Sequence, residues 1–468
     1  MKPAYPSTLG LLMALWFTVP TAQAQAGPNQ PCLGPECLIC PALSDPQQYA
    51  EGGMKIMRFM APGRGSWLFR SDVDLTTDFG MPAHMEPELA RLISTFNRQG
   101  TEVAIVIQPT RGLMHRDKVR PDFAYGFDYA EGVANLRHFL TQLRNAGAIV
   151  PDVMNLVENP PQEEYFFRRD THWTPAGAKA TAQLVAQEVR RQPVYAGLTK
   201  STYRTEPSVI IPKDGAHNMA FSRLCGNDFG YQYVQNFQTV PEVDEVSALF
   251  DDIPEPEVTL VGTSNSAARD EDTKQYNFDG YLKEYLSVNL MNFSLQGGGQ
   301  DGALMEFLLS PSYSPSTPPK LIIWELPANY KLASEVMYRQ LVPAAEGGCA
   351  ARTTVLSGRA ERSGYRENDR IEVLSNSGAQ RQALTGADGV LDIKMSDRDL
   401  RNFYVIVYYD NGSRDKVWIR RPGIVSGGQY YLELSKAAEF RNANLLSVFI
   451  EPTQASDKPI DLEVSLCR

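Results

Sequence analysis

Short, unbroken apolar runs set among helical patterns constrain the fold of this chain more than any other feature. Residues 103–107 (VAIVI), 258–261 (VTLV) and 320–325 (KLIIWE) have the length and composition of strands that are buried on both faces. Apolar residues recur at helical spacing in the neighbouring segments, as in 87–96 and 129–145. Because strands that alternate with helices form βαβ units, we expect an α/β domain built on a parallel sheet.

The same patterns indicate the remaining elements of this domain. The further strands that we expect cover residues 67–69, 153–157 and 288–293, and the further helices cover 174–190, 278–285 and 304–309. Residues 192–255 interrupt the alternation with Pro, Tyr, Asn and polar residues, which predicts a long insertion. We expect this α/β domain to occupy residues 25–345, since a chain of 468 residues is long enough for two or three domains.

A small all-β domain is expected at the C-terminal end. Beyond Gly347-Gly348 the chain contains short runs of strand type at 371–374, 403–409 and 417–420. Turn signals such as Asn411-Gly412 separate these runs. The spacing of strands and turns is typical of a β-sandwich, and we assign residues 346–468 to it.

The N-terminus predicts export. An apolar run from Leu11 to Val19 follows Lys2 and precedes Ala22-Gln23-Ala24, which is the pattern of a cleaved signal peptide over residues 1–24. The run is shorter than the roughly 20 residues that span a bilayer, and no later stretch approaches that length. We therefore expect an exported mature protein without a transmembrane segment.

The six cysteines fit an oxidising compartment, where an even number suggests disulfides. Many pairings are possible, so the connectivity stays open; Cys349 and Cys467 lie at the two ends of the β-domain and could staple it. The group of Cys32, Cys37 and Cys40 could also suggest metal binding. No matching cluster of Cys or His occurs elsewhere, so we expect neither a metal nor a cofactor.

The overall charge argues against nucleic acid as a partner. The chain has 45 Lys and Arg residues against 55 Asp and Glu residues, a formal net charge of −10. A nucleic-acid binder needs a basic face that attracts phosphates, and this balance argues against one.

Asp170 and His172 form the first part of a candidate catalytic site. They immediately precede Thr174 and Pro175, which suit the cap and the first turn of a helix. A carboxylate in that place can fix the tautomer of an imidazole and stabilise its positive charge. The pair therefore predicts a general base that still requires a nucleophile.

Ser264 is the candidate nucleophile. It lies in Gly262-Thr263-Ser264-Asn265-Ser266, directly after the strand at 258–261, and a sharp turn at a strand end can expose a serine hydroxyl above the sheet. Active sites of open α/β sheets lie at the carboxyl ends of the strands, where Asp170 and His172 are also expected. We predict that His172 takes the proton of Ser264, that Asp170 orients His172, and that the N–H of Ser264 or donors from Gly297 and Gly298 hold the oxyanion.

Other residues compete for these roles. Ser266 is the near alternative to Ser264 as the nucleophile. His115 follows the strand at 103–107 and could line the cleft, although a structural role is favoured for it. An isolated Asp-x-His and a Gly-Thr-Ser turn are each common, and it is their joint occurrence at strand ends that favours catalysis.

Three motifs together carry a family resemblance. Residues 170–177 (DTHWTPAG), Gly262-Thr263-Ser264 after a strand, and residues 65–69 (GSWLF) resemble the SGNH-hydrolase-like acetyltransferases of bacterial exopolysaccharide export. With the signal peptide and the cysteine-closed β-domain, the resemblance covers nearly the whole mature chain and is most specific to the periplasmic alginate O-acetyltransferases. It implies an SGNH-like fold followed by a carbohydrate-binding β-sandwich.

The resemblance also implies a function. It predicts a triad of Asp170, His172 and Ser264 that acetylates mannuronate hydroxyl groups of alginate in the periplasm through an acetyl-serine. It implies disulfides that join Cys40 to Cys225 and Cys349 to Cys467. The implied partners are the polymer, an acetyl donor that is a protein or a small ester, and other periplasmic proteins of alginate biosynthesis and export.

Two features depart from ordinary SGNH enzymes. Those enzymes place Gly-Asp-Ser first and the Asp/His pair near the C-terminus, whereas the motif order is permuted here. Thr263 also replaces the Asp that precedes the serine. Triads are recognised by geometry rather than order, so the permutation is compatible with the expected chemistry.

The β-domain offers a candidate polysaccharide-binding face. In residues 414–421 (RDKVWIRR), a period of two places Lys416, Trp418 and Arg420 on one face of a strand, and Arg421 follows directly. An aromatic ring between cations suits an acidic sugar, since the ring takes the apolar sugar face and the cations take the carboxylate. The alternative is an ordinary solvated face with one partly buried Trp.

Three functions remain in competition. The chain could be an O-acetyltransferase, an esterase that passes the acetyl group to water, or a non-catalytic polysaccharide-binding scaffold of an export complex. The first two use the same triad and differ in which acceptor reaches the acyl-enzyme.

Overall fold

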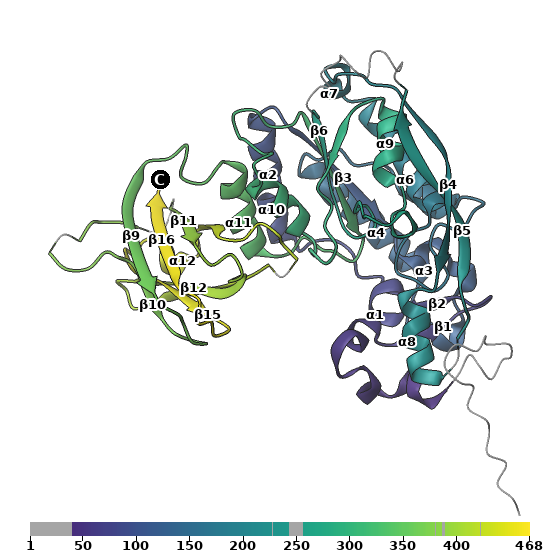
Figure 1. Cartoon of the computed structure of the whole chain (residues 1–468), viewed down its shortest axis with the longest axis horizontal. Helices are drawn as coiled ribbons and strands as arrows, with labels where there is room; N and C mark the ends of the chain where they lie inside the picture. The colour runs from purple at the N-terminus through teal and green to yellow at the C-terminus, as the bar shows by residue number, and fades with distance from the viewer. Residues whose placement is uncertain (1–39, 227, 243–255, 380, 386–388, 422) are drawn as a thin grey trace, which may run out of the picture.

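The computed structural model describes residues 40–226, 228–242, 256–379, 381–385, 389–421 and 423–468. It contains an α/β domain and a β-domain that follow one another along the long axis of the molecule (Figure 1). The expected signal peptide, Cys32 and Cys37 lie outside the described residues. In the described ranges, no helix is both long enough and apolar enough to cross a membrane.

A parallel four-stranded sheet forms the centre of the α/β domain, as predicted. Its strands lie in the order β3 (Glu102–Gln108), β8 (Leu321–Pro327), β6 (Val258–Val261) and β7 (Leu290–Asn292). Nearly all side chains of β3, β6 and β8 are buried because helices cover the sheet. Toward the β-domain lie α2 (Glu86–Arg98), α10 (Gly302–Leu309) and α11 (Glu335–Ala345), and beyond the sheet lie α6 (Pro175–Val189) and α9 (Phe278–Leu286) (Figure 1).

The predicted strand at 153–157 is wrong. Residues Met154–Glu158 form the short helix α5, after α4 (Tyr129–Asn145). Short apolar runs fit either structure, and here Leu156 and Val157 face the core from a helix. The extended contact to the sheet is made slightly earlier, where Ile149 forms an isolated parallel bridge with Ala104 of β3.

The segment expected to interrupt the alternation forms an antiparallel pair beside the main sheet. Strands β4 (Tyr203–Lys213) and β5 (Gln232–Pro241) pair with each other, and α8 (Ala216–Cys225) lies between them in the chain. The disulfide Cys40–Cys225 joins the C-terminal end of α8 to the start of the described chain. The short elements that complete this domain are β1 (Met60–Pro62), β2 (Leu68–Arg70), α1 (Ser71–Asp74), α3 (Arg111–Met114) and α7 (Pro193–Ala196).

The β-domain is a sandwich of two antiparallel sheets. One sheet has the order β10-β15-β12-β13, and the other β14-β11-β16-β9. The second disulfide, Cys349–Cys467, connects the two ends of this segment. Its elements are β9 (Thr354–Arg362), β10 (Ile371–Ser375), β11 (Val390–Met395), β12 (Asn402–Tyr409), β13 (Arg414–Arg420), β14 (Gln429–Glu433), α12 (Ala438–Arg441), β15 (Leu445–Pro452) and β16 (Ile460–Cys467).

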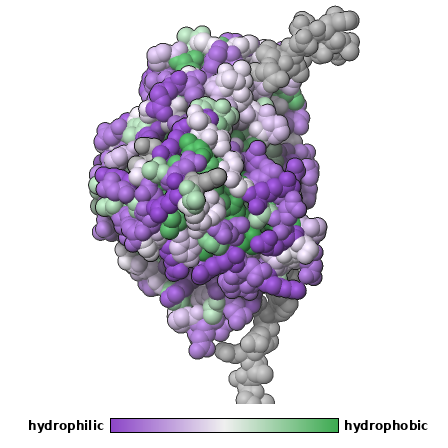
Figure 2. All heavy atoms as spheres, turned by 90° about the vertical axis from the view of Figure 1, so that its left-hand side faces the viewer, coloured by the Kyte–Doolittle hydropathy of each residue, from purple (hydrophilic) through white to green (hydrophobic). Residues whose placement is uncertain are grey.

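Helix α11 connects the two domains. Arg339 donates from Nε to the Glu433 carbonyl oxygen (2.9 Å) and forms an ion pair with Asp415 (2.6 Å), so it ties the helix to both sheets of the sandwich. The end view of the β-domain in Figure 2 shows a mostly hydrophilic surface with hydrophobic side chains gathered near its middle. Inside the domain, the buried apolar side chains form one cluster.

Candidate active site

Ser264, His172 and Asp170 lie together in the order that a catalytic triad requires. The Oγ of Ser264 is 2.9 Å from Nε2 of His172, and Nδ1 of His172 is 2.5 Å from Oδ1 of Asp170. Asp170 is buried, whereas the His172 side chain is 14% exposed and Ser264 is half-buried. The arrangement can move a proton from the serine hydroxyl to the imidazole while the carboxylate holds the ring.

A tight loop carries Asp170 and His172 to the sheet edge. An antiparallel bridge between Phe166 and Trp173 closes this loop, and Thr174 then caps α6 by accepting a hydrogen bond from the Gly177 N–H (3.1 Å). The N–H of Trp173 also donates to Oδ1 of Asn265, which lies next to the nucleophile (3.2 Å). The loop and the nucleophile turn are therefore held together directly.

The segment between β4 and β5 supports the acid. Oδ2 of Asp170 accepts from the Ala216 N–H at the start of α8 (2.8 Å), and Lys213 Nζ lies 3.3 Å from Oδ1. Gly215 permits this approach, since its φ is +94° and a Cβ there would lie 2.2 Å from the Arg169 carbonyl oxygen. Burial alone would raise the pKa of Asp170, but His172, Lys213 and the Ala216 N–H hold it well below its usual value.

The imidazole is held in its neutral, basic form. Burial lowers the pKa of His172; the carboxylate of Asp170 opposes this shift, and the positive charge of Lys213 adds to it. Lys213 also donates to the hydroxyl of Tyr276 (2.8 Å), whose ring lies beside that of His172 with centroids 5.5 Å apart. A neutral ring at neutral pH can accept the Ser264 proton.

A buried carboxyl group supports the nucleophile turn. Oε2 of Glu325, near the end of β8, accepts from the N–H of Thr263 (2.8 Å), and the Glu325 carboxyl also accepts from the Thr263 hydroxyl (2.9 Å). The hydroxyl of Ser266 donates to the same oxygen (3.1 Å). Burial raises the pKa of Glu325, and these three donors oppose the rise. Ser266, the alternative nucleophile, therefore faces Glu325, and Ser264 faces His172.

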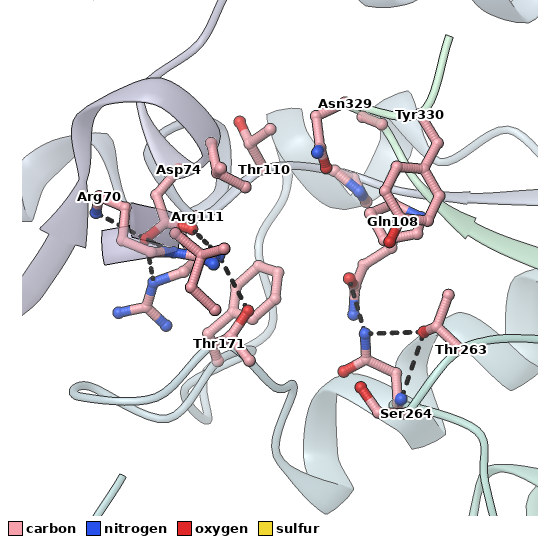
Figure 3. Close-up of a pocket in the computed structure, with 17 residues that line it drawn as sticks. Arg70, Asp74, Gln108, Thr110, Arg111, Thr171, Thr263, Ser264, Asn329 and Tyr330 are labelled. Atoms are coloured by element: carbon pink, nitrogen blue, oxygen red, sulfur yellow. Dashed lines mark hydrogen bonds and ion pairs between the residues drawn. The ribbon is translucent and has the colours of Figure 1, made fainter. Parts of the chain in front are cut away.

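A chain of hydrogen bonds from Glu325 ends at Gln108, the last residue of β3. The Thr263 hydroxyl donates to Glu325 and accepts from Nδ2 of Asn265 (3.3 Å), which also donates to Oε1 of Gln108 (3.1 Å). Nε2 of Gln108 is buried and has no hydrogen-bond partner among the described residues. Figure 3 shows Gln108 extending from its strand toward the turn of Thr263 and Ser264. Gln108 and Ser264 both line the cavity beside the nucleophile, so the amide adjoins the cavity with its donor capacity unused.

Gly297 and Gly298 are not among the residues that line the cavity beside Ser264. The turn that contains them packs against the β-domain, where a Cβ on Gly423 would be 3.0 Å from the Gly297 carbonyl oxygen and 3.1 Å from the Gly298 N–H nitrogen. The cavity that Ser264 lines is formed by other segments. This placement corrects the expectation that Gly297 and Gly298 supply oxyanion donors.

His115 is buried against Trp67 and accepts from the Phe166 N–H (3.3 Å), which is a structural role.

The β-domain presents three of its four candidate residues on one face. Lys416, Trp418 and Arg420 are exposed on the edge strand β13, and the intervening Val417 and Ile419 are buried, as the period of two predicts. Trp418 is 48% exposed, and the Arg420 guanidinium lies 5.6 Å from its ring centroid.

Arg421 is a correction to the predicted binding face. It is buried between the domains, where its Nη2 donates to Oε1 of Gln340 on α11 (2.5 Å). Burial lowers its pKa to about 10. The strand ends at Arg420, and the chain turns inward after it, so Arg421 does not share the exposed face.

Sequence reasoning did not identify Gln108, Glu325 or Lys213 as parts of this site. Gln108 and Glu325 carried one usable signal: each is a polar residue near the carboxyl end of an apolar strand, and both positions are almost fully buried. Lys213 lies near the end of β4 and carried no such signal.

Comparison with known proteins identifies the family. Residues 60–328 match the model of the SGNH hydrolase-like domain of acetyltransferase AlgX, and residues 348–468 match a C-terminal carbohydrate-binding module. The chain is 32% identical to the alginate biosynthesis protein AlgX of Pseudomonas aeruginosa over 449 residues. This alignment covers 96% of this chain and 92% of that protein. The chain belongs to the AlgX family.

One solved structure and two further sequence relatives agree with this assignment. The structure of Pseudomonas aeruginosa AlgX matches with a TM-score of 0.81 at 32% identity, over 92% of this chain and 99% of that one. The AlgX of Azotobacter vinelandii is also 32% identical, over 92% of this chain and 88% of that protein. The probable alginate O-acetylase AlgJ of Pseudomonas putida is 29% identical over 57% of this chain and 69% of that protein.

The AlgX-family assignment confirms the predicted fold class. An SGNH-hydrolase-like acetyltransferase domain with a parallel sheet is followed by a carbohydrate-binding module with antiparallel sheets. Both disulfides that the resemblance implied, Cys40–Cys225 and Cys349–Cys467, are present.

Proposed function

We propose that this protein transfers an acetyl group from an ester donor to hydroxyl groups of mannuronate residues in alginate, in the periplasm. The observation that carries this proposal is the 2.9 Å contact between Ser264 Oγ and His172 Nε2, with Asp170 on the far side of the ring. The names of the relatives support the substrate, since they are an alginate biosynthesis protein and a probable alginate O-acetylase.

The proposed reaction has two halves. In the first, His172 takes the proton of Ser264, Oγ attacks the acetyl carbonyl carbon, and the donor's leaving group departs with that proton. In the second, His172 takes the proton of a sugar hydroxyl, whose oxygen attacks the acetyl-Ser264 carbonyl. Ser264 then leaves as the alcohol by recovering the proton, so the acetyl group has moved to the sugar.

Each half passes through a tetrahedral oxyanion, for which we propose Gln108 as a donor. Its Nε2 is buried and unpaired among the described residues, and Gln108 is one of the residues that line the same cavity as Ser264. The N–H of Ser264 is the second candidate. A donor that is fixed before the reaction stabilises the developing charge without reorganisation.

The acceptor decides between a transferase and an esterase. Purified protein should be incubated with an acetyl-ester donor and oligomannuronate, and the sugar analysed by mass spectrometry. We expect acetylated oligosaccharide in excess of free acetate. If acetate forms and no acetylated sugar appears, the site is that of an esterase.

We further propose that the exposed face of β13 binds the polymer. Trp418→Ala should weaken oligomannuronate binding about tenfold, because an exposed Trp beside Arg420 supplies both a flat apolar surface and a cation. Calorimetric titration measures the affinity, and the thermal midpoint should change little because the side chain is on an edge strand. Tyr231→Ala is the matched control, since Tyr231 is an exposed aromatic on the α/β domain. Unchanged affinity of Trp418→Ala would exclude this face.

A further inference from the structure

The cavity beside Ser264 has two chemically different walls. It encloses about 320 Å³, which suits a ligand the size of a single sugar residue. Figure 3 shows Thr263, Ser264 and Gln108 on one side, and Arg70, Asp74 and Arg111 on the other. The first wall carries the candidate chemistry, and the second has no role in the steps described above.

The second wall carries an excess of positive charge. Asp74 is buried and forms a 2.8 Å ion pair with Arg70, and Arg111 Nε lies 3.6 Å from its Oδ2. Arg70, with smaller contributions from His217 and Arg111, holds the pKa of Asp74 at about 2 against the effect of burial, so this carboxylate is ionised. His217 also lies 3.6 Å from Asp74, but burial lowers its pKa to about 3 and leaves it neutral. Two positive charges therefore face the Asp74 carboxylate, and the other nearby carboxylate, Asp170, is itself paired with Lys213.

Among the described residues, each guanidinium group keeps one N–H without a hydrogen-bond partner: Nε of Arg111, 3.6 Å from Asp74 Oδ2, and Nη1 of Arg70. Arg111 uses Nη1 and Nη2 on four backbone carbonyl oxygens, those of Leu68, Phe167, Arg168 and Asp170. Arg70 uses Nε and Nη2 on Asp74 and on the Thr171 hydroxyl (2.9 Å), and its Nη1 has no partner among the described residues. Arg111 therefore holds the backbone of the second wall in place, and Arg70 keeps its Nη1 group available as a donor.

Two further observations place this donor in a binding site. Thr171, which Arg70 holds, immediately precedes His172, so the guanidinium lies next to the candidate triad. Thr110 lines the same cavity and is more than nine-tenths buried, and its hydroxyl has no partner among the described residues. A buried unpaired hydroxyl and an unpaired guanidinium N–H are costly unless a ligand satisfies them.

We propose that Arg70 and Thr110 form a subsite that binds the carboxylate of the sugar whose hydroxyl receives the acetyl group. This proposal rests on the proposed function and makes the catalytic cavity itself, rather than the β-domain alone, selective for a uronate. A guanidinium recognises a carboxylate through charge and directed hydrogen bonds, and Thr110 adds a neutral donor. Holding the acid group in the cavity would orient the sugar ring toward Ser264.

The test compares trimannuronate with trimannose, its carboxyl-reduced counterpart, in which each carboxylate is replaced by a CH2OH group. Only acetylation of the ring hydroxyls that both acceptors share is counted. With one acetyl-ester donor, the wild type should show at least tenfold higher kcat/KM for trimannuronate. Arg70→Gln should lose this preference, because KM should rise at least fivefold more for trimannuronate than for trimannose. Arg70→Lys should keep part of the preference, because it keeps the charge and loses the planar group.

Three controls keep the result interpretable. Arg58→Gln makes the same charge change at an exposed position outside the cavity and should behave as the wild type. Arg70→Gln/Asp74→Asn removes both buried charges, which covers the case in which Arg70→Gln alone does not fold. Repeating the comparison on Trp418→Ala removes any preference contributed by the β-domain.

The outcomes separate this proposal from the proposed function. Equal use of both acceptors by the wild type overturns the carboxylate subsite and leaves acetyl transfer intact. An equal loss with both acceptors and in acetate release in Arg70→Gln and the double variant assigns Arg70 a structural role only. If the wild type acetylates neither acceptor, the proposed function fails and the subsite fails with it.

Discussion

Ser264→Ala should abolish acetyl transfer, with kcat falling by about a millionfold, as happens when the nucleophile of a triad is removed. Without the hydroxyl that lies 2.9 Å from His172, no acetyl-enzyme can form. The measurement is acetylated oligomannuronate by mass spectrometry, with a serine-directed probe and peptide mapping as the second readout. Labelling should be confined to residue 264 in the wild type and absent in the variant.

Ser266→Ala is the informative comparison for Ser264. Ser266 lies two residues further along the same turn but donates to Glu325, so its loss leaves the contact between Ser264 and His172 in place. Probe labelling at Ser264 should therefore persist in Ser266→Ala. If Ser264→Ala instead leaves polymer acetylation in cells unchanged, the chain acts as a non-catalytic polysaccharide-binding scaffold.

Gln108→Ala should lower kcat by about 10²–10³-fold, the effect of losing one oxyanion donor. The expected reason is the loss of the unpaired Nε2 group of a residue that lines the same cavity as Ser264. KM should change little, since the donor acts on charge that develops in the transition state. Single-turnover measurement of acetyl-enzyme formation separates this step from acceptor binding.

Gln108→Glu distinguishes an oxyanion donor from a structural amide. The substitution keeps the size and an acceptor for Asn265 Nδ2, but it replaces the donor with an oxygen that carries negative charge. It should therefore reduce kcat at least as strongly as Gln108→Ala, with a thermal midpoint close to that of the wild type at a pH where both fold. A glutamate variant with near wild-type kcat would show that Gln108 does not face the oxyanion.

The parallel sheet and the proximity of Asp170, His172 and Ser264 could be predicted because their signals are local. An apolar run such as 103–107 must be buried wherever it packs, and a serine that ends a buried strand must lie at the sheet edge. The triad loop reached that edge by a different route from the one expected. It follows helix α5 rather than a strand, and the bridge between Phe166 and Trp173 holds it in place.

The remaining parts of the site depend on contacts between distant segments. Lys213 contacts Asp170, 43 positions away in the sequence, and Gln108 contacts Asn265, 157 positions away. Neither contact produces a pattern in the local sequence from which it could be predicted. Gly297-Gly298 had the right residue type after a strand, but the turn leads toward Gly423 of the β-domain. Arg421 continued a charged run, yet the strand had already ended at Arg420.

The position of β8 has a consequence for how the chain reaches this structure. β8 is the last of the four sheet strands to be synthesised, yet it lies between β3 and β6 and is hydrogen-bonded to both. The two halves of the sheet therefore have no direct contact through strand pairing until residues 321–327 have emerged. Before that moment β3 and β6 each present an open edge of an apolar strand, which is the state most exposed to aggregation during folding.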